Sequence, residues 1–134
     1  WLPDVKYDDE ATARRLSGAP GYVARNREAL RFMWRDAGPL CTGEDCVATG
    51  GVLVRHMVLP GGLAGTRGCL AFLAREFGPG AAVSLMHQYF PAHRAHDLPP
   101  LDRKLTWEEW EAALLALEEA GIERGFFQEW DEDG

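Results

Sequence analysis

Hydrophobic positions along the chain alternate between extended runs and helical stripes. Two almost continuous apolar runs, at residues 52–59 and 81–88, are bounded by glycine and proline, which is typical of strands buried on both faces of a parallel sheet. The other predicted elements are four helices, at residues 8–18, 20–37, 66–77 and 106–121, and two short extended segments, at residues 1–7 and 122–127. This alternation predicts an α/β fold with right-handed crossovers between parallel strands.

The last predicted helix has the clearest boundaries. Thr106 and Glu109 have the spacing of a capping box, and Gly121 is expected to end the helix. The two long connections, at residues 40–51 and 90–104, lack apolar periodicity and are predicted to be loops.

Composition and charge narrow the class of protein. The chain of 134 residues is 46% hydrophobic, which is enough for one domain, residues 1–134, with its own core. Its net charge is −7, and ten acidic residues follow residue 106, so the charge belongs to the last helix and to an acidic tail at residues 128–134. The sequence has neither the basic surface expected of a nucleic-acid partner nor an apolar run long enough for a membrane span.

The cysteines and the chain start add two expectations. The chain has three cysteines, Cys41, Cys46 and Cys69, an odd number without the spacing of a disulfide-stabilised domain. This favours a reducing, cytoplasmic location. Only three or four strands are predicted, and the first residue is Trp1 rather than Met. Both features predict that the chain is part of a longer protein.

Polar side chains interrupt the predicted strands with a period of two. The pairs that share a strand face are Asp4 with Lys6, Arg55 with Met57, and Ser84 with Gln88. Sites in α/β folds gather at the carboxyl ends of the strands. Because a charge inside an apolar strand must find a partner, Arg55 is a candidate functional residue, with a structural ion pair as the alternative. Asp4 and Lys6 either serve a site or simply pair with each other.

Two further motifs are weaker. The glycine-rich segment PGGLAGT, residues 60–66, precedes a predicted helix and is either a tight turn or a site for an anion such as phosphate. The residues His87, His93, His96 and Asp97 are of metal-binding types, but their spacing matches no standard zinc pattern.

Several strings together resemble radical SAM proteins related to the pyruvate formate-lyase activating enzyme. They are LPDVKY, EATARRLSGAPGYVARNREAL, GVLVRHMVLPGGLAGT, VSLMHQYFPAHRA and LTWEEWEAAL. The resemblance runs over nearly the whole chain but covers only the C-terminal half of the family pattern. It implies the C-terminal half of a TIM-like barrel, that is, a parallel-stranded partial (β/α) barrel.

The resemblance also implies cofactors and site residues. In this family a [4Fe-4S] cluster binds S-adenosylmethionine and cleaves it reductively, and the resulting 5′-deoxyadenosyl radical takes a hydrogen atom from the substrate. In activating enzymes the substrate is a glycine of a partner protein, a glycyl radical enzyme, whereas other members act on small molecules. Matched by position, the residues that would contact S-adenosylmethionine are Asp4, Lys6, Arg55, Ser84, Gln88 and Tyr89.

The sequence departs from the family where the cluster is bound. It contains no Cys-x3-Cys-x2-Cys segment and no Gly-Gly-Glu segment, and the spacing of Cys41 and Cys46 does not replace them. The chain alone is therefore not expected to bind the cluster or to catalyse the reaction. The alternative hypothesis is a free-standing, non-catalytic α/β domain that binds a protein partner through its acidic C-terminal helix.

Overall fold

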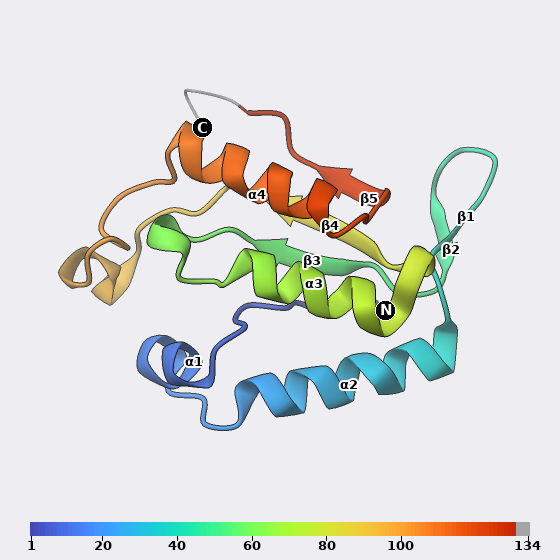
Figure 1. The fold of residues 1–134 in the computed structure, drawn as a ribbon, viewed down its shortest axis with the longest axis horizontal. Coiled ribbons are helices and arrows are strands. Elements are labelled where there is room, and N and C mark those ends of the chain that lie inside the picture. Colours follow the sequence, from blue (N-terminus) through green and yellow to red (C-terminus); the bar gives the residue numbers. More distant parts are fainter. Residues whose placement is uncertain (131–134) are drawn as a thin grey trace.

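Three strands form a parallel sheet whose order follows the chain. The strands are β3 (Val54–Met57), β4 (Ala82–Met86) and β5 (Arg124–Phe127), in the order β3-β4-β5. A computed structural model describes residues 1–130 (Figure 1). The N-terminal segment, residues 1–7, runs parallel to β3, and Asp4 and Arg55 form a bridge at the edge of the sheet. The predicted α/β class with a parallel sheet is confirmed, and the partial barrel stays a prediction.

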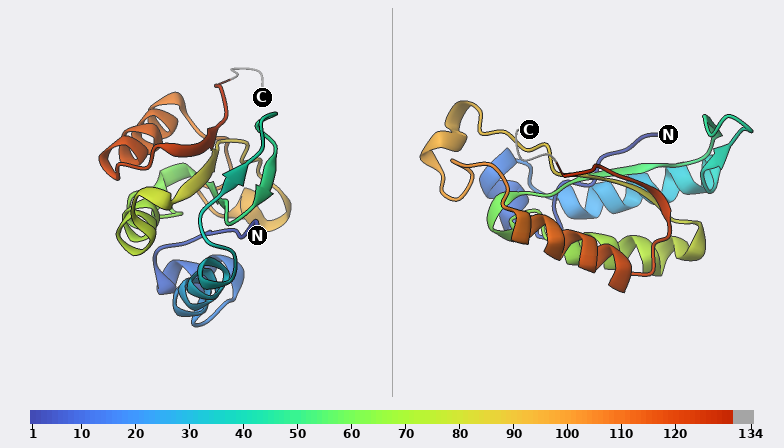
Figure 2. Two further views of the ribbon diagram at one scale, coloured as in Figure 1. Left: turned by 90° about the vertical axis from the view of Figure 1, so that its right-hand side faces the viewer. Right: turned by 90° about the horizontal axis from the view of Figure 1, so that it is seen from above.

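Helices cover one face of this sheet. The helices are α1 (Glu10–Ser17), α2 (Tyr22–Ala37), α3 (Thr66–Phe77) and α4 (Trp107–Glu119). Figure 2 shows α3 and α4 side by side on one face, with α2 beside the N-terminal segment. The core joins these helices to the sheet through Leu30 of α2, Leu73 of α3 and Trp110 of α4, which pack with Val54 and Leu85. Each of these side chains is at most 3% exposed, so burial of apolar area holds the layers together.

The ends of the helices follow the predicted signals. The hydroxyl of Thr106 accepts a hydrogen bond from the backbone N–H of Glu109, and the Glu109 carboxylate accepts one from the N–H of Thr106, as a capping box requires. Gly18 ends α1 in the left-handed conformation, at φ 60°.

Two connections are more ordered than predicted. The prediction of a loop over residues 40–51 is wrong in part, because β1 (Cys41–Thr42) and β2 (Ala48–Gly50) form an antiparallel hairpin there. Both strands are exposed, so their sequence lacks the alternation of apolar and polar residues that predicts a strand. Within residues 90–104, the segment His93–Asp97 forms a 3-10 helix. Elsewhere in the chain, shorter 3-10 helices occur at Pro60–Gly62 and Gly78–Gly80.

The C-terminal end matches the prediction as far as it is described. The last extended segment is confirmed as β5. The predicted acidic tail, residues 128–134, lies outside the described residues from position 131 onward. Among residues 1–130, no helix has the length and apolar character needed to cross a membrane.

Candidate functional site

The two faces of the sheet have different surroundings. On β3, Val54 and His56 point into the helical layer and are buried, whereas Arg55 and Met57 lie on the opposite face and are partly exposed. The prediction that both faces are buried is therefore wrong for this strand. On β4, Ser84 and Met86 are likewise only partly buried. The period of two along β3 and β4 separates a buried face from a partly exposed one.

Four of the six predicted site residues meet in one small pocket on the uncovered face. This sheet-face pocket has a volume of about 110 Å³ and is lined by Asp4, Val5, Lys6, Arg55, Met57, Met86 and Gln88. Met57 ends β3, Gln88 lies just beyond the end of β4, and Lys6 follows the bridge residue Asp4 of the N-terminal segment. The pocket therefore lies toward the carboxyl ends of the strands, where α/β folds place their sites. The prediction from strand parity and the position of this pocket therefore agree for Asp4, Lys6, Arg55 and Gln88.

Asp4 holds both cations of the pocket. The Nε of Arg55 lies 2.7 Å from Oδ1 of Asp4, and the Nζ of Lys6 lies 3.1 Å from Oδ2. Burial raises the pKa of Asp4, but hydrogen bonds and charge from Lys6 and Arg55 outweigh it, so the pKa is lowered. The sequence left open whether Asp4 and Lys6 pair with each other, and they do, with Arg55 as a third member. The three groups together carry one net positive charge.

The other two predicted residues lie outside the pocket lining. Ser84 is paired in register with Arg55 and is half-buried on the same sheet face. The hydroxyl of Tyr89 donates a hydrogen bond to the backbone oxygen of Leu101, 2.8 Å away, so it is turned toward the connection before α4. Ser84 is thus placed to extend the site, whereas Tyr89 supports a neighbouring loop.

His56 is a site neighbour whose role the sequence did not show. It is fully buried, with Nδ1 2.7 Å from the backbone oxygen of Val5 and Nε2 2.9 Å from the hydroxyl of Thr66. A carbonyl can only accept, so Nδ1 carries the proton and Nε2 accepts from Thr66. Burial lowers the pKa of His56, which keeps the ring neutral. The imidazole thereby links the N-terminal segment, β3 and the start of α3.

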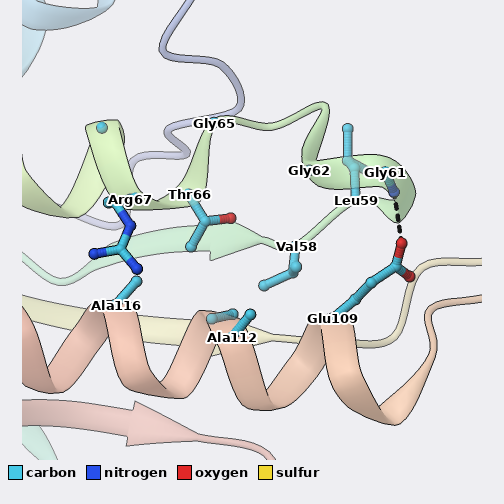
Figure 3. Close-up of a pocket in the computed structure, with 12 residues that line it drawn as sticks. Val58, Leu59, Gly61, Gly62, Gly65, Thr66, Arg67, Glu109, Ala112 and Ala116 are labelled. Carbon is cyan, nitrogen blue, oxygen red and sulfur yellow. Dashed lines mark hydrogen bonds between the residues drawn. The ribbon is translucent and has the colours of Figure 1, made fainter.

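The glycine-rich segment borders a separate groove. The groove has a volume of about 420 Å³ and lies between the start of α3 and the first turns of α4 (Figure 3). The N–H of Gly61 donates to Glu109 at 2.7 Å. A hydrogen bond from Arg103, helped by the N–H groups of Gly61 and Thr106, lowers the pKa of Glu109 to about 2. The ionised carboxylate of Glu109 therefore already accepts the Gly61 N–H that a bound anion would need.

A second carboxylate, that of Asp8, lies against the start of α3. A Cβ on Gly65 would lie 2.8 Å from the Cβ of Asp8, and one on Gly68 would overlap the Asp8 carboxylate. Arg27 pairs with Asp8 at 2.7 Å. Like charges repel, so these contacts favour the tight-turn interpretation of PGGLAGT over a phosphate site.

The residues of metal-binding types lie in two places, with His87 just after β4 and with His93, His96 and Asp97 in the 3-10 helix at His93–Asp97. Among residues 1–130, no group of three or more His, Cys, Asp or Glu side chains is arranged to hold a metal ion. His87 packs against Trp110 and Trp130, and its Nε2 lies 2.9 Å from the backbone oxygen of Glu129. Cys41 and Cys46 are exposed on the hairpin, and burial raises the pKa of Cys69 to about 12.

Comparison with known proteins finds a relative that is longer than this chain. No family model matches the chain. The chain is 34% identical over 127 residues to the uncharacterized protein MJ0674 of Methanocaldococcus jannaschii, and the match covers 92% of this chain and 32% of that protein. The chain therefore spans about a third of the length of the curated relative it matches. The name of that relative states no activity, so the function of this chain has to be inferred from its site.

Proposed function

We propose that this chain is the C-terminal, cofactor-binding portion of a radical SAM enzyme of the glycyl-radical-enzyme-activating type. The observation that carries the proposal is the sheet-face pocket. Asp4, Lys6, Arg55 and Gln88 come from three distant parts of the sequence, were matched to S-adenosylmethionine contacts, and line the same pocket. The alternative is that Asp4, Lys6 and Arg55 form a purely structural ion-pair cluster, and the binding experiment below decides between the two interpretations.

The chemistry of the pocket suits one end of S-adenosylmethionine. The methionyl end of this molecule carries a carboxylate and an ammonium group, which complement the cations Arg55 and Lys6 and the carboxylate of Asp4. A volume of about 110 Å³ holds only such an end, so the remainder would lie along the uncovered face toward Ser84. The chemistry that S-adenosylmethionine supplies in this family is abstraction of a hydrogen atom from a substrate.

The iron-sulfur cluster does not fit this chain. Cluster ligation needs three cysteine thiolates close together. Cys69 is buried, and burial raises the pKa of its thiol, whereas Cys41 and Cys46 are exposed on the hairpin. No cluster-forming group occurs among the described residues. The proposal therefore assigns the cluster to another part of a longer protein, and the residues of this chain only bind and orient S-adenosylmethionine.

The strand order supports the partial barrel as part of the proposal. The N-terminal segment, β3, β4 and β5 are adjacent in chain order and parallel, with helices on one face. A (β/α) barrel repeats this arrangement eight times around a closed sheet. In a complete barrel the uncovered face would become the interior, and the sheet-face pocket would open at the carboxyl ends of its strands.

Ligand binding tests the proposed site. Titration of the purified chain with S-adenosylmethionine, followed by saturation-transfer NMR, should give a signal that is lost in Arg55→Leu and kept in Arg35→Leu, an exposed arginine of α2. Loss of one charge-assisted contact predicts at least a tenfold weaker binding. Equal binding by wild type and Arg55→Leu would refute the assignment.

The longer protein tests the activity. The native reading frame that encodes this chain should also encode a Cys-x3-Cys-x2-Cys segment. After anaerobic reconstitution with iron and sulfide, the full protein should form 5′-deoxyadenosine from S-adenosylmethionine in the presence of a reductant. A reading frame without the cysteine motif, or a reconstituted protein without a cluster, would exclude the radical SAM function.

One observation favours the alternative, a free-standing domain that binds a partner. The outer edge of the N-terminal segment is covered by α2, because Asn26 donates to the backbone oxygen of Asp4 and the hydroxyl of Tyr22 accepts the N–H of Lys6, both at 2.9 Å. A covered edge ends a sheet. Sedimentation separates the two functions: a stable monomer supports the free-standing domain, whereas self-association supports an opened barrel.

A further inference from the structure

Gln128 connects the carboxyl ends of β4 and β5 beside the sheet-face pocket. Its backbone N–H donates to the oxygen of Leu85 at 3.3 Å. Its side-chain Oε1 accepts from the backbone N–H of His87 at 3.1 Å, and its Nε2 donates to Oε1 of Gln88 at 3.2 Å. A residue that no motif singled out therefore contacts the polar side chain at the mouth of the pocket.

The backbone N–H of His87 determines which atoms donate and which accept in this chain of hydrogen bonds. A backbone N–H can only donate, so the side chain of Gln128 must turn its oxygen toward His87 and its nitrogen toward Gln88. Gln88 must then use its oxygen as the acceptor. Its Nε2 lies on the other side, 3.9 Å from the sulfur of Met86, which also lines the pocket.

This orientation changes what a ligand meets. The two oxygens of Asp4 each accept one bond, from Arg55 and from Lys6. With the amide of Gln88 turned as above, its N–H donors join those of Arg55 and Lys6 among the residues that line the pocket. Such a pocket selects a ligand group that offers several acceptors, which a carboxylate does.

We propose that Gln128 is a specificity-determining positioning residue, which holds Gln88 so that its amide N–H groups serve the carboxylate of the bound molecule. The inference rests on the proposed function, since S-adenosylmethionine supplies that carboxylate. Gln128 acts through Gln88 and needs no contact with the ligand.

The variant Gln128→Glu reverses the polarity at small steric cost. One carboxylate oxygen keeps the bond from His87, and the other accepts from Nε2 of Gln88, so Gln88 turns its oxygen to the pocket. The dissociation constant for S-adenosylmethionine should rise about tenfold, the effect of exchanging a donor for an acceptor opposite a charged group.

A double-mutant cycle separates positioning from added charge or structural damage. In a Gln88→Leu background, Gln128→Glu should change the dissociation constant by less than about twofold, because the group that it reorients is gone. A tenfold effect that persists in this background would overturn the proposal, since it would not act through Gln88.

A ligand-independent measurement keeps this inference apart from the proposed function. The His87 N–H donates to Oε1 of Gln128, so a scalar coupling between the His87 amide nitrogen and the side-chain carbonyl carbon Cδ of Gln128 should be detectable by NMR in the wild type without ligand. Its absence would overturn the inference. Its presence in a chain that does not bind S-adenosylmethionine would confirm the orientation of Gln88 while refuting the proposed function.

Discussion

Arg55 and His56 are neighbours in sequence and opposites in environment. Arg55 lies on the uncovered face of the sheet, where it pairs with Asp4 and is partly exposed to solvent. His56 lies on the helix-covered face, fully buried, with both ring nitrogens hydrogen-bonded and its pKa lowered by burial. A single step along the strand thus separates a partly exposed, ion-paired environment from a buried, hydrogen-bonded one. The covered face is expected to govern stability, and the uncovered face to govern binding.

The largest expected effect comes from the covered face. Trp110→Ala removes a side chain that is 1% exposed and should destabilise the fold by about 3–5 kcal/mol, because a large cavity replaces it. Met57→Ala, on the uncovered face, should cost about 1 kcal/mol, since Met57 is already partly exposed. Urea denaturation measures both. Equal losses would show that the two faces do not differ as described.

His56 should matter for stability more than Arg55. His56→Phe leaves the carbonyl of Val5 and the hydroxyl of Thr66 without their partner and should cost about 2 kcal/mol. Arg55→Leu should cost less than about 1 kcal/mol, because its ion pair with Asp4 is partly exposed. The same urea titrations compare them, and a greater loss in Arg55→Leu would reverse the assignment of the faces.

Acid should act on the covered face through His56. Burial lowers the folded-state pKa of His56 below the unfolded value, so the unfolded state binds a proton first as the pH falls. Stability should decrease by up to about 1.4 kcal/mol per pH unit from about pH 6.5 down to the folded pKa. Melting temperatures of the wild type should show this loss, and those of His56→Phe should lack it. A wild type that is insensitive to pH between 7 and 5 would contradict a neutral, buried ring.

The smallest effect is expected for the carboxylate of the uncovered face. The pKa of Asp4 is lowered, so its contribution is present above the unfolded pKa and is lost as the pH falls through the folded pKa. Because Asp4, Lys6 and Arg55 are partly exposed, Asp4→Asn should change stability at pH 7 by less than about 1 kcal/mol. Urea denaturation at neutral pH checks the value. A loss of several kcal/mol would show that the cluster is structural rather than a binding site.

The parts of the site that depend on local patterns were predictable from the sequence, and the parts that depend on contacts between distant residues were not. Strand parity was sufficient to group Asp4 with Lys6 and Arg55 with Met57, because the period of two is a local property. The partners of His56 lie 51 and 10 residues away, and those of Gln128 about 40 residues away, so no local pattern signalled them. The hairpin at residues 41–50 escaped prediction for a different reason, since both of its strands are exposed.

The sequence by itself determined the α/β class, the four helices and the parity of the strands, because apolar periodicity and capping act over a few residues. Only the tertiary structure decided that helices cover one sheet face and leave the other uncovered, since this depends on how α2, α3 and α4 pack. It also decided which polar residues meet. Asp4 and Arg55 are 51 positions apart, and only the parallel pairing of their strands brings their side chains to 2.7 Å.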